Sequence, residues 1–523
     1  MPATHEPPAE PLTALVRQEW TAFRSRGRLI ALTAATLATI LLGLLVGVVN
    51  RSTCSEGTVE VPCANDPVGP AGQAVSDQFY FAHQPLGENG SITARMTSMT
   101  GTITYPPPAH DEIVPGLVPW AKAGIIVKDG TRQGSSYAAL MVTGSHGVRM
   151  QYDYVHDTAG RPGGVSASSP RWLRLTRAGD TITGEESTDG AHWTTVGTAR
   201  LPGLPRTALV GLFATSPGDL TLRPTGLGGS IVESRFTQAS AVFDNIALAG
   251  DGSGTGSRWS HGSVGEMGHT DWERYHRPPG LVESNGTATV TGSGDIAPLD
   301  MVGRHTVEDT LVGLVIGLMM VIVLAVRFGS GGYRPGPTGA GLLGGRVLAA
   351  KAVVVGAVTF LAGLVAAGVV LPFGTAVLRA NGNAVLAVPA LTQVRVVVGV
   401  AALLAVAAVL ALALGVLFRR TWVAILVAIS AVVLPYILGA LPILPDGVSE
   451  WLLRLTPAAG FAVQQTVREY PQVLSHYAPS AGYFPLPWWA GLAVLCGYAA
   501  VALGLGMTRP RRTVAPRSQA EWR

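Results

Sequence analysis

The strongest constraint on this chain is a set of long apolar runs that contain no charged side chain. Charged residues make up 13% of the 523 residues, about half the ~25% of a typical globular protein. A helix of about 20 apolar residues is long enough to cross ~30 Å of hydrocarbon. The sequence therefore predicts a multi-pass membrane protein and excludes a purely soluble enzyme. Six spans are expected, at 29–49, 310–326, 352–372, 396–418, 421–443 and 486–508.

Basic residues cluster at one set of span ends, which predicts the orientation. They precede the first span and follow the second, fourth and sixth: Arg17, Arg24, Arg26, Arg28, Arg327, Arg334, Arg346, Lys351, Arg419, Arg420, Arg509, Arg511, Arg512, Arg517 and Arg523. Arginine and lysine are enriched in cytoplasmic loops. We therefore expect a bacterial cell membrane protein with both termini cytoplasmic, including the N-terminal segment 1–28 and the basic tail 509–523, and residues 50–309 outside. The net charge of +4 then requires no nucleic acid partner.

The first run could also belong to a signal peptide. It has a basic flank, but it is longer than a 7–15-residue signal core, and no clear A-x-A cleavage site follows it. A retained helix is therefore favoured. The interiors of the spans carry no acidic or basic residue, which argues against an ion-coupled secondary transporter. The pairs Gly43/Gly47 and Gly313/Gly317 could let helices approach closely, although a chain with 65 glycines contains such spacings by chance.

Residues 75–250 read as an all-β domain between two linker segments, 50–74 and 251–309. About ten β-rich runs alternate with turn signals, which is typical of a sandwich or jelly roll. The expected strands are 77–82, 91–97, 121–128, 136–143, 148–155, 171–177, 181–187, 193–199, 208–214 and 241–249. The dipeptides Asp129–Gly130 and Asp189–Gly190 are hairpin-turn signals.

The segments WAKAGIIVKDG (120–130), RWLRLTRAGDTITGEESTDGAHWTTVG (171–197) and VFDNIAL (242–248) resemble the concanavalin-A-like (laminin-G-like) jelly rolls of bacterial secreted proteins. The resemblance implies two curved antiparallel sheets, and such folds often bind glycans on the concave face. The aromatic residues that could stack on sugars are Trp120, Tyr137, Tyr152, Trp172 and Trp193. The alternative is that they fill the core, as aromatic residues in strands usually do.

No catalytic residue is predicted in this domain. Glycosidases need two carboxylates at a defined separation, and jelly-roll glucanases carry a Glu-x-Asp-x-x-Glu signature. The nearest carboxylates, Glu185, Glu186 and Asp189, do not match it. A membrane-bound carbohydrate enzyme is therefore disfavoured.

Cys54 and Cys63 lie just after the first span. An extracytoplasmic location is oxidising, so a disulfide is expected between them; free thiols or metal ligands are the alternatives. No cysteine or histidine partner stands at zinc spacing, so neither a metal site nor a bound cofactor is predicted.

The segment Leu12–Arg24 spaces its apolar residues at helical intervals. This pattern predicts an amphipathic helix on the membrane surface, with a plain cytoplasmic extension of the first span as the alternative. Together with ALVRQEWTAFRSRGRL (14–29), GSGDIAP (292–298) and the loop 325–367, it resembles the permeases of the second class of ABC exporters in actinobacteria. In that family an Arg/Trp-rich interfacial helix precedes the first span. An E-Y-R-x-G motif follows the second span, and P-R-R-G-R-V-L-A-A-K leads into the third.

The match to these motifs is partial. Tyr333, Arg334 and Gly336 match, as does the run 345–351, but the family's Glu is Gly332 here and its P-R-R is replaced around Leu343. The resemblance implies a coupling surface for an ATPase, formed by Arg17, Glu19, Trp20, Phe23, Arg24, Tyr333, Arg334, Arg346 and Lys351.

The resemblance also implies the partners. A separate cytoplasmic ATP-binding subunit would use ATP and Mg²⁺, and a second permease protomer, identical or different, would complete the transporter in the lipid membrane. The sequence is consistent with a separate ATP-binding subunit, because it contains no G-x-x-x-x-G-K-[ST] phosphate-binding loop. The alternative is a membrane-anchored glycan-binding receptor or adhesin that moves nothing, and a partner ATPase would distinguish the two.

Overall fold

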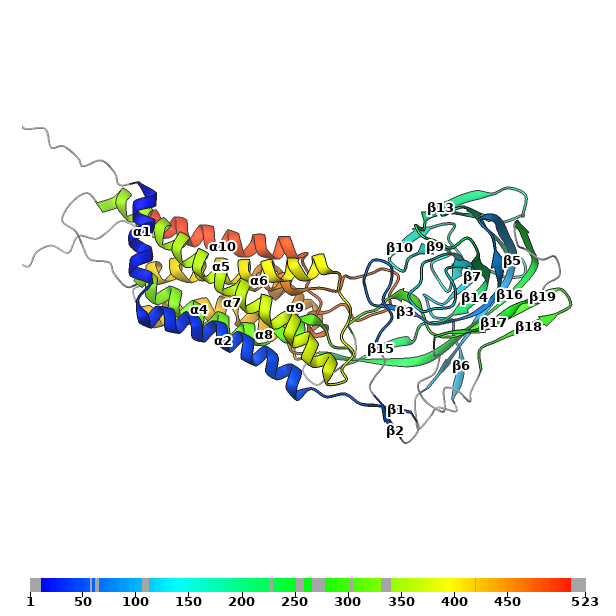
Figure 1. Cartoon of the computed structure of the whole chain (residues 1–523), viewed down its shortest axis with the longest axis horizontal. Helices are drawn as coiled ribbons and strands as arrows, with labels where there is room; N and C mark the ends of the chain where they lie inside the picture. Colours follow the sequence, from blue (N-terminus) through cyan, green and yellow to red (C-terminus); the bar gives the residue numbers. More distant parts are fainter. Residues whose placement is uncertain are drawn as a thin grey trace, which may run out of the picture.

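The computed structural model describes residues 11–56, 59–61, 65–105, 112–224, 229–250, 258–265, 278–301, 304–330, 340–418 and 420–508. Figure 1 shows an elongated molecule, with a bundle of long helices at one end and a β-sandwich-like domain at the other. Six helical segments of the described part are long and apolar enough to cross a membrane, as the sequence predicted. They are Arg26–Val49, Val307–Ser330, Gly345–Ala380, Ala390–Leu417, Thr421–Ala440 and Trp488–Thr508.

The helical part contains both long and short elements. The long helices are α2 (Arg26–Val49), α4 (Gly313–Ser330), α5 (Ala340–Ala380), α6 (Ala390–Leu417) and α10 (Trp488–Thr508). The shorter ones are α1 (Leu12–Phe23), η1 (Val307–Leu311), α7 (Thr421–Val432), α8 (Leu434–Ala440), α9 (Asp446–Leu455), η2 (Pro457–Gln464) and η3 (Pro479–Ala481).

Two of the expected spans differ from the structure. Helix α5 has 41 residues, about 60 Å at 1.5 Å per residue, and so extends well beyond the expected 352–372. The expected span 421–443 is divided at Val433 into α7 and α8. Pro435 stands in the first turn of α8, where its missing N–H removes no helical hydrogen bond, whereas further along it would. The break therefore falls where the proline is tolerated.

Close contacts between small residues hold α2 against its neighbours. A Cβ atom on Gly313 would collide with the backbone oxygen of Thr39, and one on Gly43 with that of Thr310. A Cβ on Gly47 would come within 3.2 Å of the Gly374 oxygen. Both glycine pairs thus lie at tight helix contacts, as small residues in membrane helices allow, but they face different partners rather than each other.

The sandwich contains two large antiparallel sheets. The strands are β3 (Val75–Asp77), β4 (Phe79–Leu86), β5 (Asn89–Thr104), β6 (Ile113–Pro115), β7 (Lys122–Lys128), β8 (Tyr137–Thr143), β9 (Val148–Tyr152), β10 (His156–Ala159), β11 (Arg171–Ala178), β12 (Thr181–Ser187), β13 (Thr194–Arg200), β14 (Ala208–Thr215), β15 (Asp219–Pro224), β16 (Ser230–Gly250), β17 (Ser260–Val264), β18 (Gly280–Ser284), β19 (Thr287–Gly292) and β20 (Ile296–Pro298). One sheet has the order β10-β9-β8-β7-β14-β4-β17, and the other β13-β12-β11-β5-β16-β19-β18, with β15 on β16 and β6 on β5. Strand β3 pairs with β20, and the short strands β1 (Cys54–Glu56) and β2 (Val59–Val61) pair with each other.

The sandwich extends beyond its predicted end at residue 250. Strand β17 joins the seven-stranded sheet, and β18 and β19 join the nine-stranded sheet, so these strands of the expected linker 251–309 belong to the domain. Strand β17, SHGSV, exposes all its residues except Val264. It therefore lacks the alternating apolar pattern by which a strand is recognised.

The centre of the seven-stranded sheet is buried on both faces. Residues such as Ile125 and Val127 pack between the two sheets, whereas Phe81, Ile126 and Phe213 form a second cluster on the opposite face. Strands β7 and β8 are consequently buried along their whole length. Continuous apolar runs in their sequences are typical of strands covered on both sides.

Candidate functional site

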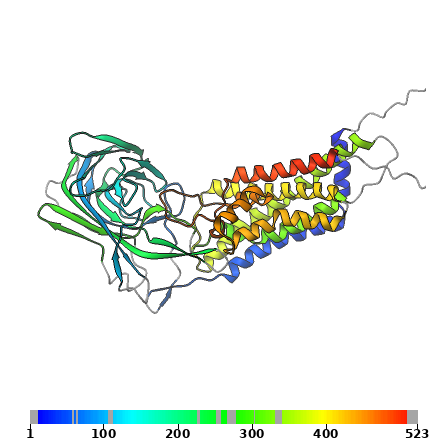
Figure 2. The ribbon, with the colours of Figure 1, turned by 180° about the vertical axis from the view of Figure 1, so that it is seen from behind.

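Helix α1 lies across the end of the bundle farthest from the sandwich, as both views show (Figures 1 and 2). Leu15 and Phe23 are buried, whereas Arg17 and Arg24 are exposed. Positions Leu15, Glu19 and Phe23 are four residues apart and therefore share one face of the helix. The predicted amphipathic helix is present, and its inner face contacts the bundle.

A cluster of five side chains, the collar cluster, joins α1 to three other helices; its members are Glu19, Phe23, Arg28, Phe328 and Lys351. The ammonium of Lys351 on α5 lies 3.8 Å from the Glu19 carboxylate and donates a hydrogen bond to the Phe328 backbone oxygen at 3.2 Å. Phe23 packs edge-on to the Phe328 ring, with the centroids 5.2 Å apart. Arg28 and Lys351 lie 4.9 and 4.8 Å from the centroid of that ring. One phenylalanine of α4 is thus contacted from α1, α2 and α5.

The structure brings together only some of the expected coupling residues. Glu19, Phe23 and Lys351 belong to the collar cluster. Trp20 is 42% exposed and stacks beside Phe23 with a centroid distance of 6.5 Å. Arg346 lies near the start of α5, half-buried. Arg17 and Arg24 point away from the cluster, and Tyr333 and Arg334 lie outside the described residues.

Charge is distributed unequally along the bundle. The end that carries α1 contains Arg17, Arg24, Arg26, Arg28, Arg327, Arg346, Lys351 and Arg420, and Glu19 is the one carboxylate there among the described residues. At the other end, two of the arginines lie beside acids. Arg454 pairs with Glu450 at 2.9 Å, and Arg304 lies 3.2 Å from an oxygen of Asp66.

The chain leaves the bundle for the sandwich through a set of amide contacts. Asn383, between α5 and α6, donates to the Asn50 oxygen at 2.8 Å and accepts from the Ser52 hydroxyl at 2.7 Å. Asn381 donates to the Gly47 oxygen at 2.6 Å. These bonds fix the segment that follows α2 against the far end of α5.

The sandwich also contacts the segment between α9 and α10. The hydroxyl of Ser230 on β16 lies 3.5 Å from the His476 imidazole, and the amide of Gln472 donates to the Tyr154 oxygen at 3.5 Å. The Ala74 N–H donates to the Ala387 oxygen at 3.2 Å. The two parts of the molecule are therefore joined by polar contacts from several loops.

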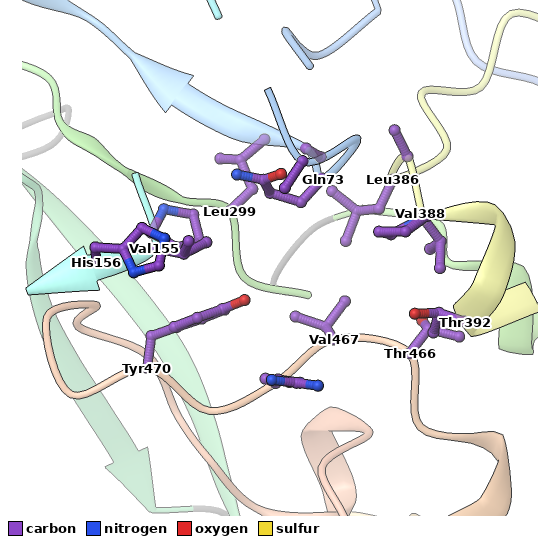
Figure 3. A pocket seen from close by; sticks show the side chains of 16 residues that line it. Gln73, Val155, His156, Leu299, Leu386, Val388, Thr392, Thr466, Val467 and Tyr470 are labelled. Carbon is purple, nitrogen blue, oxygen red and sulfur yellow. The ribbon is translucent and has the colours of Figure 1, made fainter. Parts of the chain in front are cut away.

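A cavity of about 430 Å³ lies at this junction. Figure 3 shows the side chains of Gln73, His156, Thr392, Thr466 and Tyr470 around it, with the Tyr470 hydroxyl directed inward. Burial raises the pKa of Tyr470, so its hydroxyl remains a neutral donor. The volume is in the range of small-molecule sites, and the lining supplies hydrogen-bonding groups together with the apolar walls Leu386 and Val467.

Two of the aromatic residues considered for sugar stacking are buried, as the alternative interpretation expects. Tyr137 has no exposed surface and packs against Tyr154, with the ring centroids 4.9 Å apart. Trp120 is 4% exposed and stacks on His146 at 4.0 Å. Tyr137 belongs to the cluster on the outer face of the seven-stranded sheet, whereas Trp120 lies in the turn before β7.

The other two tryptophans lie partly exposed on the outer face of the nine-stranded sheet. In β11, Leu173 and Leu175 point into the core, so Trp172 and Arg174 occupy the opposite face. Arg174 lies 4.0 Å from the Trp193 ring centroid, and Arg95 lies 5.7 Å from that of Trp172. Tyr152, on the other sheet, stacks with His156 at 4.2 Å and is remote from this pair in sheet order.

The sequence did not reveal a buried ionic network beneath the seven-stranded sheet. Lys128 lies 2.8 Å from the Asp77 carboxylate, and neither side chain has exposed surface. The Tyr154 hydroxyl also donates to Asp77 at 2.8 Å. A second lysine of β7, Lys122, lies 2.6 Å from Asp295. One signal was available: the two lysines are six residues apart in KAGIIVK, so they share one face of the strand with the buried Ile126.

In the part of the chain that the structure describes, no three His, Cys, Asp or Glu residues lie close enough to hold a metal ion. Cys63 lies outside the described residues, so its expected disulfide with Cys54 stays a prediction.

No protein-family model and no curated protein sequence matches the chain. Among solved structures, the crystal structure of scytalido-glutamic peptidase with a transition state analog inhibitor is similar at 9% identity. It covers 42% of this chain and 99% of the peptidase, with a TM-score of 0.27. A functionally unknown protein from Saccharomyces cerevisiae is 17% identical over 32% of this chain and 71% of its own, with a TM-score of 0.18. Likenesses this weak carry no argument about activity.

Proposed function

We propose that the chain is the membrane-spanning permease subunit of an ATP-driven exporter, energised by a separate cytoplasmic ATP-binding subunit that uses ATP and Mg²⁺. The observation that carries the proposal is the way in which α1 packs against the end of the bundle. Its inner face is fixed to α4 and α5 by the collar cluster, while Arg17, Trp20 and Arg24 remain exposed. The exposed side offers a partner a surface, and the buried side connects that surface to the bundle.

Close packing is what would make α1 a transmitting element. Packed interiors respond to displacement as connected bodies because they contain few voids. A force on α1 would pass through Glu19 and Lys351 to α5, whose 41 residues run the length of the bundle (Figure 1). Rocking of such helices against a second permease protomer is the kind of motion that alternating access requires.

The charge distribution supports the proposed orientation. Cations gather at the α1 end of the bundle, and cytoplasmic flanks are enriched in arginine and lysine. We place this end and both termini in the cytoplasm. The sandwich would then be an extracytoplasmic jelly roll of the concanavalin-A type, inserted between the first and second spanning helices.

The test is co-purification. The tagged chain is expressed with its neighbouring genes, extracted in mild detergent, and examined for an ATP-binding subunit and for ATP hydrolysis. Arg17→Glu with Arg24→Glu reverses two exposed charges on α1 and should lower both subunit recovery and hydrolysis by about tenfold or more, since each lost charge-assisted contact costs about 1.5–3 kcal/mol. Arg206→Glu on the sandwich, whose side chain is 93% exposed, is the matched control and should change neither. A wild-type chain that recovers no ATPase would contradict the proposal.

A second candidate function is an anchored glycan receptor, favoured by the partly exposed Trp172 and Trp193. Each ring is partly exposed and lies beside an arginine, and exposed aromatic faces can stack on sugars. Retention of the full chain on cell-wall glycan, lost in a Trp172→Ala, Trp193→Ala variant and kept in Trp120→Phe, would support this candidate. Absence of retention would dismiss it.

A further inference from the structure

A groove opens between α2 and α4 at the end of the bundle that carries α1. Its volume is about 650 Å³, within the range of small-molecule sites. The residues that line it are Ser25, Gly27, Arg28 and Ala31 on one side and Met319, Met320, Val323, Leu324 and Arg327 on the other. It is separate from the junction cavity, which lies at the opposite end of the bundle.

The groove lies where the tight glycine contact between α2 and α4 has ended. Toward the sandwich, Gly313 and Gly317 press against the backbone of α2 at Thr39 and Ala35. Toward α1 this glycine contact ends, and apart from Arg28 the α2 side is lined by small residues. A Cβ on Gly27 would meet no atom within 4 Å. The close backbone contact is therefore confined to the half of α4 nearer the sandwich, whereas toward α1 the Arg28 side chain reaches the Phe328 ring.

The chemistry of the lining changes along the groove in one direction. On α4, Arg327 stands at the open end, Val323 and Leu324 one turn deeper, and the two methionines two turns deeper. Eight residues of helix span about 12 Å. On α2, Arg28 stands at the same end as Arg327. The groove thus has a cationic mouth and an apolar interior, and unbranched methionine side chains adapt to occupants of varied shape.

The two arginines give the mouth a net positive charge. No carboxylate stands among the lining residues, and the Glu19 carboxylate of the collar cluster faces Lys351. Arg28 donates to the Ala22 backbone oxygen at 2.6 Å, a contact that leaves its charge uncompensated. Arg327 is exposed. Guanidinium groups bind phosphate oxygens well because their paired N–H donors match the spacing of those oxygens.

We propose that this groove binds an anionic phospholipid of the cytoplasmic leaflet, with the phosphate between Arg28 and Arg327 and an acyl chain along Val323, Met319 and Met320. The argument for this occupant is complementarity: cationic groups lie at the level of the headgroups, and an apolar channel runs from them into the membrane. The proposal rests on the cytoplasmic placement of the α1 end, but not on transport or on an ATP-binding subunit.

The test is native mass spectrometry of the purified full chain titrated with dioleoyl phosphatidylglycerol or with dioleoyl phosphatidylcholine. One phosphatidylglycerol should be retained at least tenfold more tightly than phosphatidylcholine. Arg327→Gln should lower the affinity for phosphatidylglycerol about tenfold, which is the expected effect of losing one charge-assisted contact. Val323→Trp, which fills the apolar interior, should abolish retention of both lipids. Arg26→Gln removes an exposed arginine of the same helix end that does not line the groove, and it should change retention less than twofold.

Each other outcome would overturn the proposal. Equal retention of the two lipids would mean that the groove does not select an anionic lipid and is occupied instead by a protein segment or by unspecifically bound detergent. An equal loss of phosphatidylglycerol retention in Arg327→Gln and Arg26→Gln would show that the general surface charge, and not the groove, attracts the lipid. Unfolding temperatures of all variants check that a loss is not caused by misfolding. Because lipid retention needs no ATPase, its failure is distinguishable from failure of the exporter proposal.

Discussion

The ammonium of Lys351 lies 3.8 Å from the carboxylate of Glu19, and the two side chains are only 10% and 15% exposed. This contact joins α5 to α1 at a site that also includes the Phe328 ring. Ion pairs at exposed sites contribute about 0–1 kcal/mol, whereas removing one partner of a buried pair costs about 3–5 kcal/mol. The Glu19–Lys351 pair is partly buried, so we expect the free-energy cost of removing one partner to lie between these limits.

Removing one charge of this pair should loosen α1. We expect Lys351→Met to lower the free energy of unfolding by about 1–3 kcal/mol, because Glu19 is left as a half-buried charge without its cation. Trypsin should then cut at Arg17 and Arg24 faster than in the wild type. The double variant Glu19→Gln, Lys351→Met should recover part of the loss, and a double variant as unstable as the sum of both single ones would contradict a direct interaction.

The contact between α2 and η1 should be sensitive to a single methyl group. Gly43→Ala would bring a Cβ into collision with the Thr310 backbone oxygen and Val370, and we expect a loss of about 1–3 kcal/mol in detergent unfolding. Gly497→Ala on α10 is the control, since its Cβ would meet nothing within 4 Å. That variant should be neutral or up to about 1 kcal/mol more stable, because alanine is the better helix former. Equal behaviour of the two variants would refute the close packing of α2.

The buried pair in the sandwich should matter far more than an exposed one. Lys128→Met leaves Asp77 charged and buried, and we expect the free energy of unfolding to fall by about 3–5 kcal/mol. Arg200→Met removes a comparable pair with Asp180 at 2.9 Å, but Arg200 is 78% exposed. That change should cost less than about 1 kcal/mol. Urea unfolding of the full chain, followed by near-UV circular dichroism, measures both, and similar losses would contradict the burial of Lys128.

The turn that precedes Trp193 should depend on pH. Hydrogen bonding to Asp189 raises the pKa of His192, and bonds from the His192 backbone and side chain lower the pKa of Asp189. The contribution of His192 to the stability of the turn is complete below the unfolded histidine pKa of about 6.5. It is lost as pH rises through the higher pKa of the folded state. The aspartate contribution is complete above about 3.9 and is lost as pH falls through the lower folded value. The turn should therefore be most ordered between about pH 4 and 6.5.

An NMR titration of the His192 imidazole checks this. We expect its midpoint above the ordinary histidine value in the wild type and a return to that value in Asp189→Asn. A midpoint at or below the ordinary value in the wild type would show that the bond does not persist in solution.

Much of the fold follows from local patterns. Runs without charge predicted all six apolar helices, and Thr181–Ser187 was predicted to the residue, because alternation and turn dipeptides are local signals. The break at Val433 and the strands after residue 250 were missed. The break depends on how the end of α7 packs. The strands β17 and β19 are short, and both are completed by pairing with the distant strands β4 and β16, which is a non-local event.

The candidate site was predictable in part. The resemblance to exporter permeases identified Glu19, Phe23 and Lys351 as members of the expected coupling surface. Their mutual contact, and the central place of Phe328, depend on how helices distant in sequence pack together. The same limit applies to Lys128 and Asp77, because a lysine at a strand end reads as a solvent-facing residue until its partner is known.

The central claim is that α1 receives an ATP-binding subunit in the cytoplasm, and site-specific cross-linking tests it most directly. A photo-reactive residue replaces Arg17, which is exposed on α1, in the co-expressed chain. Irradiation should attach it to the ATP-binding subunit in a yield that changes when ATP is added. The same residue in place of Arg206 on the sandwich should give no such product. Cross-links from the sandwich position alone, or from neither position, would contradict the account.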